Sequence, residues 1–172
     1  MIDETMWGRV AQCHVDAENT ECFLVGRIVW SNAQWVLMQM LAPHGRWDGI
    51  ALLAQADYQT VEVDTPYCQN LVKVTALRGE DAPAYPAMGD DPRGEMLNHA
   101  QAHQLTAALE ICGSGVDDVV GTVEDVRGGL VRVRQWTDDG EEDGESAVAV
   151  DAVTAIFVGS EQLTYLDLLR RV

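Results

Sequence analysis

The 172-residue chain has 28 acidic and 11 basic residues, a formal net charge of −17, and a hydrophobic fraction of 47%. This composition is typical of a folded globular protein and excludes an intrinsically disordered chain. The negative charge disfavours binding to nucleic acid and to anionic membranes, and a basic protein partner would suit it. No apolar run reaches membrane-spanning length, and no apolar segment follows the acidic start Met1-Ile2-Asp3-Glu4, which predicts a cytoplasmic protein.

The first half of the chain predicts a short β-meander that is followed by a helix. Apolar stretches separated by polar turns, such as Asp16-Ala17-Glu18-Asn19, predict strands at 10–15, 22–30, 35–41, 50–54 and 58–63. Gly26, in the second of these strands, permits a sharp bend or the close approach of another backbone. Thr65 and Pro66 then supply a helix N-cap and a proline at the first helical position.

A linker and a second meander are predicted in the other half. Residues 77–92 contain three of the five prolines and two glycines, which is typical of a linker that ends where Pro92 starts the next helix. A helix at 92–103 leads into strands at 105–112, 119–126, 130–136, 146–150 and 153–158, and Ser160 caps a last helix. We therefore expect a first domain at 1–76, the linker at 77–91 and a second domain at 92–172.

The two meanders repeat at a constant distance of 95 residues. Val25-Gly26 recurs as Val120-Gly121, Thr65 as Ser160 and Leu71 as Leu166, with no gap between these anchors. A constant offset indicates a tandem duplication. Because units of this size are marginally stable alone, we expect the copies to pack on each other or on a second chain, and we expect a homodimer.

The pattern resembles the Sm-like and SH3-like small β-barrels. The fold class implied is mainly β with short helices (β+α): two tandem five-stranded barrels, each closed by a C-terminal helix. Sm-like proteins form rings that bind RNA through loops after the third and fifth strands. The first such loop of the second copy lies within Asp138–Glu145, which has six acids in eight positions and therefore disfavours RNA binding. The residues that carry the resemblance are Gly26, Ile28, Val36, Val61 and Val63, and Gly121, Val123, Val131, Ile156 and Val158.

An aromatic surface in the first copy is the candidate partner site. Trp30, Trp35 and Trp47 of the first copy correspond to Asp125, Leu130 and Glu142, respectively, in the second copy. On the same strand as Trp35, Leu37 and Gln39 correspond to Arg132 and Arg134. Such a face is either buried between the copies or beneath a helix, or exposed for a partner. The candidate partner surface consists of Trp30, Trp35, Leu37, His44, Arg46 and Trp47.

Signals for metal binding and catalysis are weak. Glu95, His99 and His103 are spaced to share one side of a helix, a pattern that is usually only a polar helix face. The acidic loop Asp138–Glu145 is suited to Ca²⁺ or to a solvated hairpin tip. The four cysteines form no CxxC pair; we expect reduced thiols, with a Cys13–Cys22 disulfide as the alternative. No nucleophile or phosphate-binding motif is found, and no cofactor is expected.

The sequence therefore predicts a non-enzymatic binding or regulatory module with a protein partner, such as an inhibitor of a basic protein. The first alternative is a divergent Sm-like RNA-binding protein, which requires a local basic patch around Arg27, Arg46 and Lys73. The second is a metal-dependent enzyme that uses the Glu95, His99 and His103 set or the acidic loop.

Overall fold

The computed structural model describes residues 1–16, 18, 19 and 21–172, so Ala17 of the predicted first turn lies outside the described residues. The chain divides into two compact units, unit 1 at Met1–Ala84 and unit 2 at Tyr85–Val172. No helix in the described ranges is long and apolar enough to cross a membrane.

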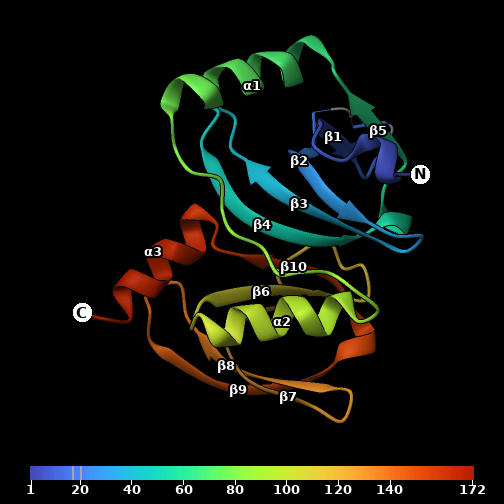
Figure 1. The fold of residues 1–172 in the computed structure, drawn as a ribbon. Helices are drawn as coiled ribbons and strands as arrows, with labels where there is room; N and C mark the ends of the chain where they lie inside the picture. Colours follow the sequence, from blue (N-terminus) through green and yellow to red (C-terminus); the bar gives the residue numbers. More distant parts are fainter. Residues whose placement is uncertain (17, 20) are drawn as a thin grey trace. The chain divides into compact units, whose positions relative to one another are not determined.

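Unit 1 is an antiparallel sheet with an α-helix, α1, which follows the last strand and packs against β1 (Figure 1). Thr65 caps α1 by accepting a hydrogen bond from the Cys68 amide, and Gly79 ends it in the left-handed conformation. Because α1 continues to Arg78, the first two residues of the predicted linker are helical. The elements are η1 (Glu4–Met6), β1 (Val10–His14), β2 (Phe23–Ser31), β3 (Trp35–Leu41), β4 (Trp47–Ala54), η2 (Gln55–Asp57), β5 (Thr60–Val63) and α1 (Pro66–Arg78).

Unit 2 begins with an additional helix, α2, that packs against β7 and β10, and it ends with α3 against β6. Asp91 caps α2 and Ser160 caps α3, each through a side-chain oxygen. The elements are α2 (Pro92–Ala102), β6 (Thr106–Ile111), β7 (Val119–Arg127), β8 (Leu130–Trp136), β9 (Glu142–Ala149), η3 (Val150–Ala152), β10 (Val153–Val158) and α3 (Glu161–Leu169).

The strands of each unit form an open sheet, so the expectation of two closed barrels is wrong. The order is β5-β1-β2-β3-β4 in unit 1 and β10-β6-β7-β8-β9 in unit 2. Closure would require β4 to pair with β5, and β9 with β10, but these strands lie at opposite ends of their orders. The 3₁₀ turns η2 and η3 redirect the chain after the fourth strand, so that the fifth strand pairs with the first. The coarser prediction, mainly β with short helices, is confirmed.

The two units have the same element order from the first strand to the last helix. The offset is 95 residues from the second strand onwards: β3 and β8 correspond end to end, as do β4 and β9. In the first strand the offset is 96, because Ala11 pairs with Gly26 whereas Ala107 pairs with Gly121. Compared with unit 1, unit 2 therefore has one additional residue before its first strand and one residue fewer between its first and second strands.

Gly26 and Gly121 are required by close backbone approach rather than by an unusual backbone conformation. A Cβ at Gly26 would lie 2.6 Å from the carbonyl oxygen of Gln39, and one at Gly121 would lie 2.0 Å from that of Arg134. These carbonyls belong to the neighbouring strands β3 and β8, so the clash could be relieved only by moving the backbone of the sheet.

Replacing Gly26 or Gly121 with alanine should lower the free energy of unfolding by about 1–3 kcal/mol, because the added methyl group overpacks a strand pair. Urea denaturation followed by circular dichroism measures the change, with Thr60→Ala, on an exposed position of β5, as control. A Gly26→Ala protein as stable as this control would contradict the assigned register.

The fourth strands start earlier than predicted, at Trp47 and at Glu142 instead of residues 50 and 146. The acidic loop Asp138–Glu145 is therefore not a free hairpin tip along its whole length, because its last four residues belong to β9. Arg132 donates to Glu145 at 2.6 and 2.9 Å, and Arg134 lies 3.7 Å from Glu142. These cross-strand ion pairs favour the extended conformation of an acidic segment that charge alone would leave as a loop.

The cysteines are all free thiols in two different environments. Cys13 and Cys68 are buried, whereas Cys22 and Cys112 are exposed. Burial, with a smaller contribution from neighbouring Cys68, raises the pKa of the Cys13 thiol to about 12. Since the thiolate is the reactive form, Cys13 is inert near neutral pH.

A thiol reagent at pH 8 should therefore modify Cys22 and Cys112 in the native protein, and all four cysteines in denaturant. Mass spectrometry of the labelled peptides identifies the sites, and Cys22→Ser and Cys112→Ser provide the matched controls. Rapid native labelling of Cys13 would contradict the packing of β1.

Candidate functional site

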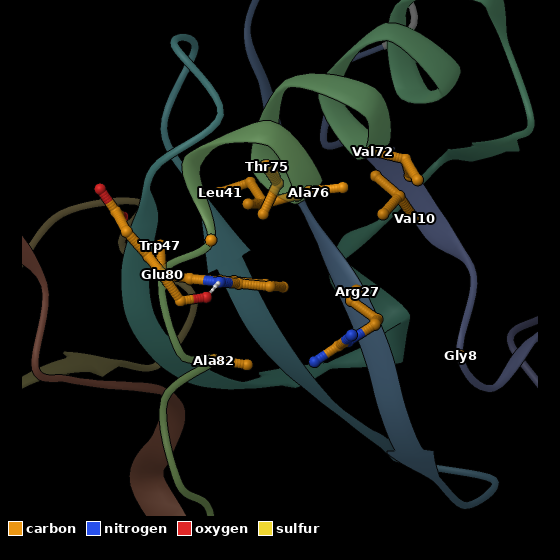
Figure 2. A pocket seen from close by; sticks show the side chains of 11 residues that line it. Gly8, Val10, Arg27, Leu41, Trp47, Val72, Thr75, Ala76, Glu80 and Ala82 are labelled. Carbon is orange, nitrogen blue, oxygen red and sulfur yellow. Dashed lines mark hydrogen bonds between the residues drawn. The ribbon is translucent and has the colours of Figure 1, made fainter.

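A pocket of about 430 Å³ lies in unit 1 between the sheet, the C-terminal half of α1 and the segment 79–82 (Figure 2). Its walls are mainly apolar, with few polar groups, which is the usual composition of a ligand site. The sheet contributes Val10, Arg27, Leu41 and Trp47, and the helix and the segment after it contribute Val72, Thr75, Ala76, Gly79, Glu80 and Ala82.

The polar group in the pocket wall with the most defined position is the guanidinium of Arg27. Its Nε and Nη2 donate to Gln39 Oε1 at 2.9 and 2.6 Å. Gln39 is only 3% exposed, and its Nε2 donates to the carbonyl oxygen of Pro83 at 2.6 Å. This chain of hydrogen bonds fixes the half-buried guanidinium from behind and holds the segment after α1 against the sheet.

Trp47 forms the side of the pocket next to Arg27. The guanidinium carbon lies 4.8 Å from the centroid of the Trp47 ring, a cation–π distance. The indole Nε1 donates to the carbonyl oxygen of Glu80 at 3.3 Å, which ties the ring to the segment after α1 (Figure 2). Glu80 is the acid of the pocket wall, and it lies 3.7 Å from Arg46 and 3.6 Å from Arg78. Three guanidinium groups thus accompany one carboxylate at this site.

Unit 2 has a hydrogen-bonded cluster at the positions that correspond to the pocket. Asp167 accepts from the amide and hydroxyl of Thr106 at 3.2 and 2.6 Å, and from Arg170 at 2.9 Å. Arg170 also donates to Thr106 and lies over the ring of Trp136 at 4.4 Å. In the shared register these four residues correspond to the pocket residues Val10, Leu41, Val72 and Thr75.

The difference between the units follows from the strand that carries the aromatic residue. In unit 1, Leu41 on β3 pairs with Trp47 on β4; in unit 2, Trp136 on β8 pairs with Glu142 on β9. Trp136 is covered by Arg170 from the helix, whereas Trp47 is covered by Arg27 from β2 and contacts the segment after the helix. The space between the sheet and the helix is therefore left as a pocket in unit 1.

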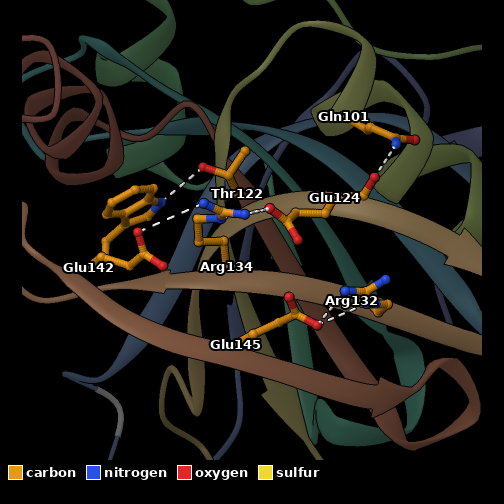
Figure 3. A network of polar contacts seen from close by, with 8 residues as sticks. Gln101, Thr122, Glu124, Arg132, Arg134, Glu142 and Glu145 are labelled. Carbon is orange, nitrogen blue, oxygen red and sulfur yellow. Dashed lines mark hydrogen bonds and ion pairs between the residues drawn. The ribbon is translucent and has the colours of Figure 1, made fainter.

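The sheet face that contains this position is ionic in unit 2. Arg134 lies 2.5 Å from Glu124, and the backbone oxygen of Glu124 accepts from Gln101 of α2 at 2.6 Å (Figure 3). Trp136 donates to Thr122 at 2.9 Å. Burial alternates at the start of β8, with Leu130 and Arg132 exposed, whereas β3 is buried along its length. Unit 2 thus has ion pairs at positions where unit 1 has buried and mostly apolar side chains.

The structure places the six residues predicted as a partner surface in two groups. Trp30 pairs with Leu37 across β2 and β3, and Trp35 starts β3; Trp35 and Leu37 are 7% and 0% exposed, and Trp30 is half-buried. Trp47 lines the pocket. Arg46 and His44 are exposed on the hairpin before it, where the His44 carbonyl oxygen accepts from Arg78 of α1. The binding role of all six stays a prediction.

The predicted metal candidates do not form a cluster. The carboxylate of Glu95 accepts from the Gly89 amide at 2.7 Å, and the rings of His99 and His103 lie 4.6 Å apart. Burial and neighbouring His103 lower the pKa of His99. Among the residues that the structure describes, no group of three or more His, Cys, Asp or Glu side chains is placed to hold a metal ion.

Sequence reasoning missed most of the pocket. It named Trp47 and placed Arg27 only in a hypothetical RNA patch, and it did not name Val72, Thr75 or Glu80. The signal that could have found them is the chemical difference between matched positions: Val72 corresponds to Asp167, and Thr75 to Arg170.

Comparisons with protein-family models, with curated proteins and with solved structures gave no match for this chain.

Replacing Asp167 with alanine should lower the free energy of unfolding by about 3–5 kcal/mol, because it leaves Arg170 without its buried partner. Val72→Ala, at the corresponding position in unit 1, removes a half-exposed side chain and should cost less than about 1 kcal/mol. Thermal and urea denaturation of both variants measure the contrast. Equal losses would show that the two positions are energetically equivalent.

Proposed function

We propose that the protein is a non-enzymatic binding module whose binding site is the pocket of unit 1, and that its ligand is a protein. The observation that carries this proposal is the open apolar pocket beside Trp47, at a position where unit 2 is filled by its own side chains. In this interpretation unit 1 is the half of the chain that recognises the ligand.

The surface next to the pocket supports a protein ligand. On the C-terminal half of α1, Val72 is 51%, Val74 41% and Leu77 87% exposed. Exposed aliphatic groups on a helix that lines a pocket with a tryptophan and an arginine are typical of protein interfaces, in which these two residue types carry much of the binding energy. An RNA ligand receives less support, because Arg46 is paired with Glu80 and the guanidinium of Arg27 is half-buried.

The matching order of elements supports a tandem duplication of a small β fold of the Sm-like or SH3-like kind, with open sheets. In this interpretation both units keep the scaffold, and one of them presents a ligand site. The cytoplasmic location and the homodimer stay predictions.

The neutral fluorescent probe N-phenyl-1-naphthylamine should bind the wild-type pocket, and Leu41→Trp should weaken this binding at least tenfold, because the introduced ring is the group that unit 2 has at this position. Ala76→Trp fills the pocket from the side of α1, and it replaces Leu41→Trp in this test if Leu41→Trp impairs folding. The control is Leu130→Trp, the same substitution at an exposed position of β8.

Affinity capture with the same proteins tests the protein ligand. Specific partners should be retained by wild type and by Leu130→Trp, and lost with both pocket-filling variants. If wild type does not bind the probe, or if the filled variants capture the same proteins as wild type, the proposal is wrong.

A further inference from the structure

We infer that the pocket of unit 1 recognises the C-terminal residue of its protein ligand, with the terminal carboxylate on the guanidinium of Arg27 and the apolar side chain against Leu41 and Val72. The inference rests on the proposed function, since it specifies which part of the protein ligand enters the pocket. It follows from the charge, the hydrogen bonding and the size of the site.

Arg27 has N–H donors left for a ligand. A guanidinium has five N–H groups and no acceptor. Within the described residues, Gln39 Oε1 accepts from Nε and from one Nη2 hydrogen, so three N–H groups remain at the Nη1–Nη2 end. Two parallel donors at this end match the two oxygens of a carboxylate, the bidentate geometry that arginine prefers.

The local charge at the pocket favours an anion. The contacts that hold Arg27, the Gln39 amide and the Trp47 ring, are neutral, so its positive charge is not cancelled where it meets the pocket. Glu80, the acid of the wall, is accompanied by Arg46 and Arg78. An anion is therefore favoured locally, although the whole chain has a charge of −17.

The shape of the pocket favours a C-terminal residue. The carboxylate and an apolar group must enter the same pocket of about 430 Å³, because Arg27 and the aliphatic wall line one space. A C-terminal residue carries its carboxylate and its side chain on the same Cα, and its backbone leaves in one direction only. An internal Asp or Glu brings backbone on both sides and no apolar group on the same residue.

The direct test uses tripeptides with the sequence N-acetyl-Gly-Gly-X, where X is Leu, Phe or Trp, each made as a free acid and as the C-terminal amide. The Nε1–H resonance of Trp47 and the Nε–H resonance of Arg27 report binding in ¹H–¹⁵N spectra of the full chain. We expect at least one free acid to bind and its amide to bind about ten- to a hundredfold more weakly, the effect of one charge-assisted contact.

The variants test the role of Arg27 itself. Arg27→Gln should bring the ratio of the free-acid affinity to the amide affinity close to one, and Arg27→Lys should restore part of this ratio. Arg132→Gln removes an exposed guanidinium of unit 2 and should change neither affinity. The comparison of acid with amide needs no substitution, so it holds even if a variant at Arg27 fails to fold.

Three results would overturn the inference and leave the proposed function intact. In the first, the free acid and the amide bind with equal affinity, and Leu41→Trp abolishes the binding of both. In the second, peptides extended beyond X bind as tightly as peptides that end at X. In the third, no peptide binds to a protein that still binds N-phenyl-1-naphthylamine. Binding of small free acids such as indole-3-acetate without any peptide would also overturn it. Failure of the neutral probe to bind wild type would instead count against the proposed function.

Discussion

The hydrogen bond between the side chain of Gln39 and the backbone of Pro83 determines the form of the site in unit 1. Gln39 is buried, and its amide can be satisfied in only one orientation, because the reverse would point its NH₂ group at the guanidinium of Arg27. The orientation that remains aims the carbonyl oxygen at Arg27 and fixes the chain after α1. One buried amide thus sets both the position of the cation and one wall of the pocket.

The two units show how the same scaffold supports two different surfaces. Both have a glycine where neighbouring backbones approach closely, and both have a capped helix after the fifth strand. The face next to that helix differs, because unit 1 places its aromatic ring on β4 and unit 2 places it on β8. The strand that carries the large aromatic side chain therefore decides what occupies this position: an open pocket in unit 1, or a closed ionic cluster in unit 2.

Local signals account for the part of the fold that could be predicted from the sequence. Thr65 and Ser160 were identifiable as caps because capping depends on immediate neighbours in the chain. Gly26 was identifiable because a glycine inside a predicted strand is typical of a bend or of close backbone approach. The early starts of β4 and β9 could not be predicted, since they depend on pairing with the neighbouring strand, of Trp47 with Leu41 and of Glu142 with Trp136. Closure of the sheets also depends on long-range pairing. The pocket was missed because its walls come from five separate segments, although Trp47 among them was predicted.

An open apolar hollow is a stability cost that selection can remove, since most proteins have stabilising substitutions within easy reach. The chain itself contains such a solution, with Trp136 and Arg170 at the positions held in unit 1 by Leu41 and Thr75. A chain selected for stability alone would have little reason to keep the two units different. Under the proposed function the asymmetry is a trade-off, in which unit 2 fills this position with its own side chains and unit 1 leaves it open for a ligand.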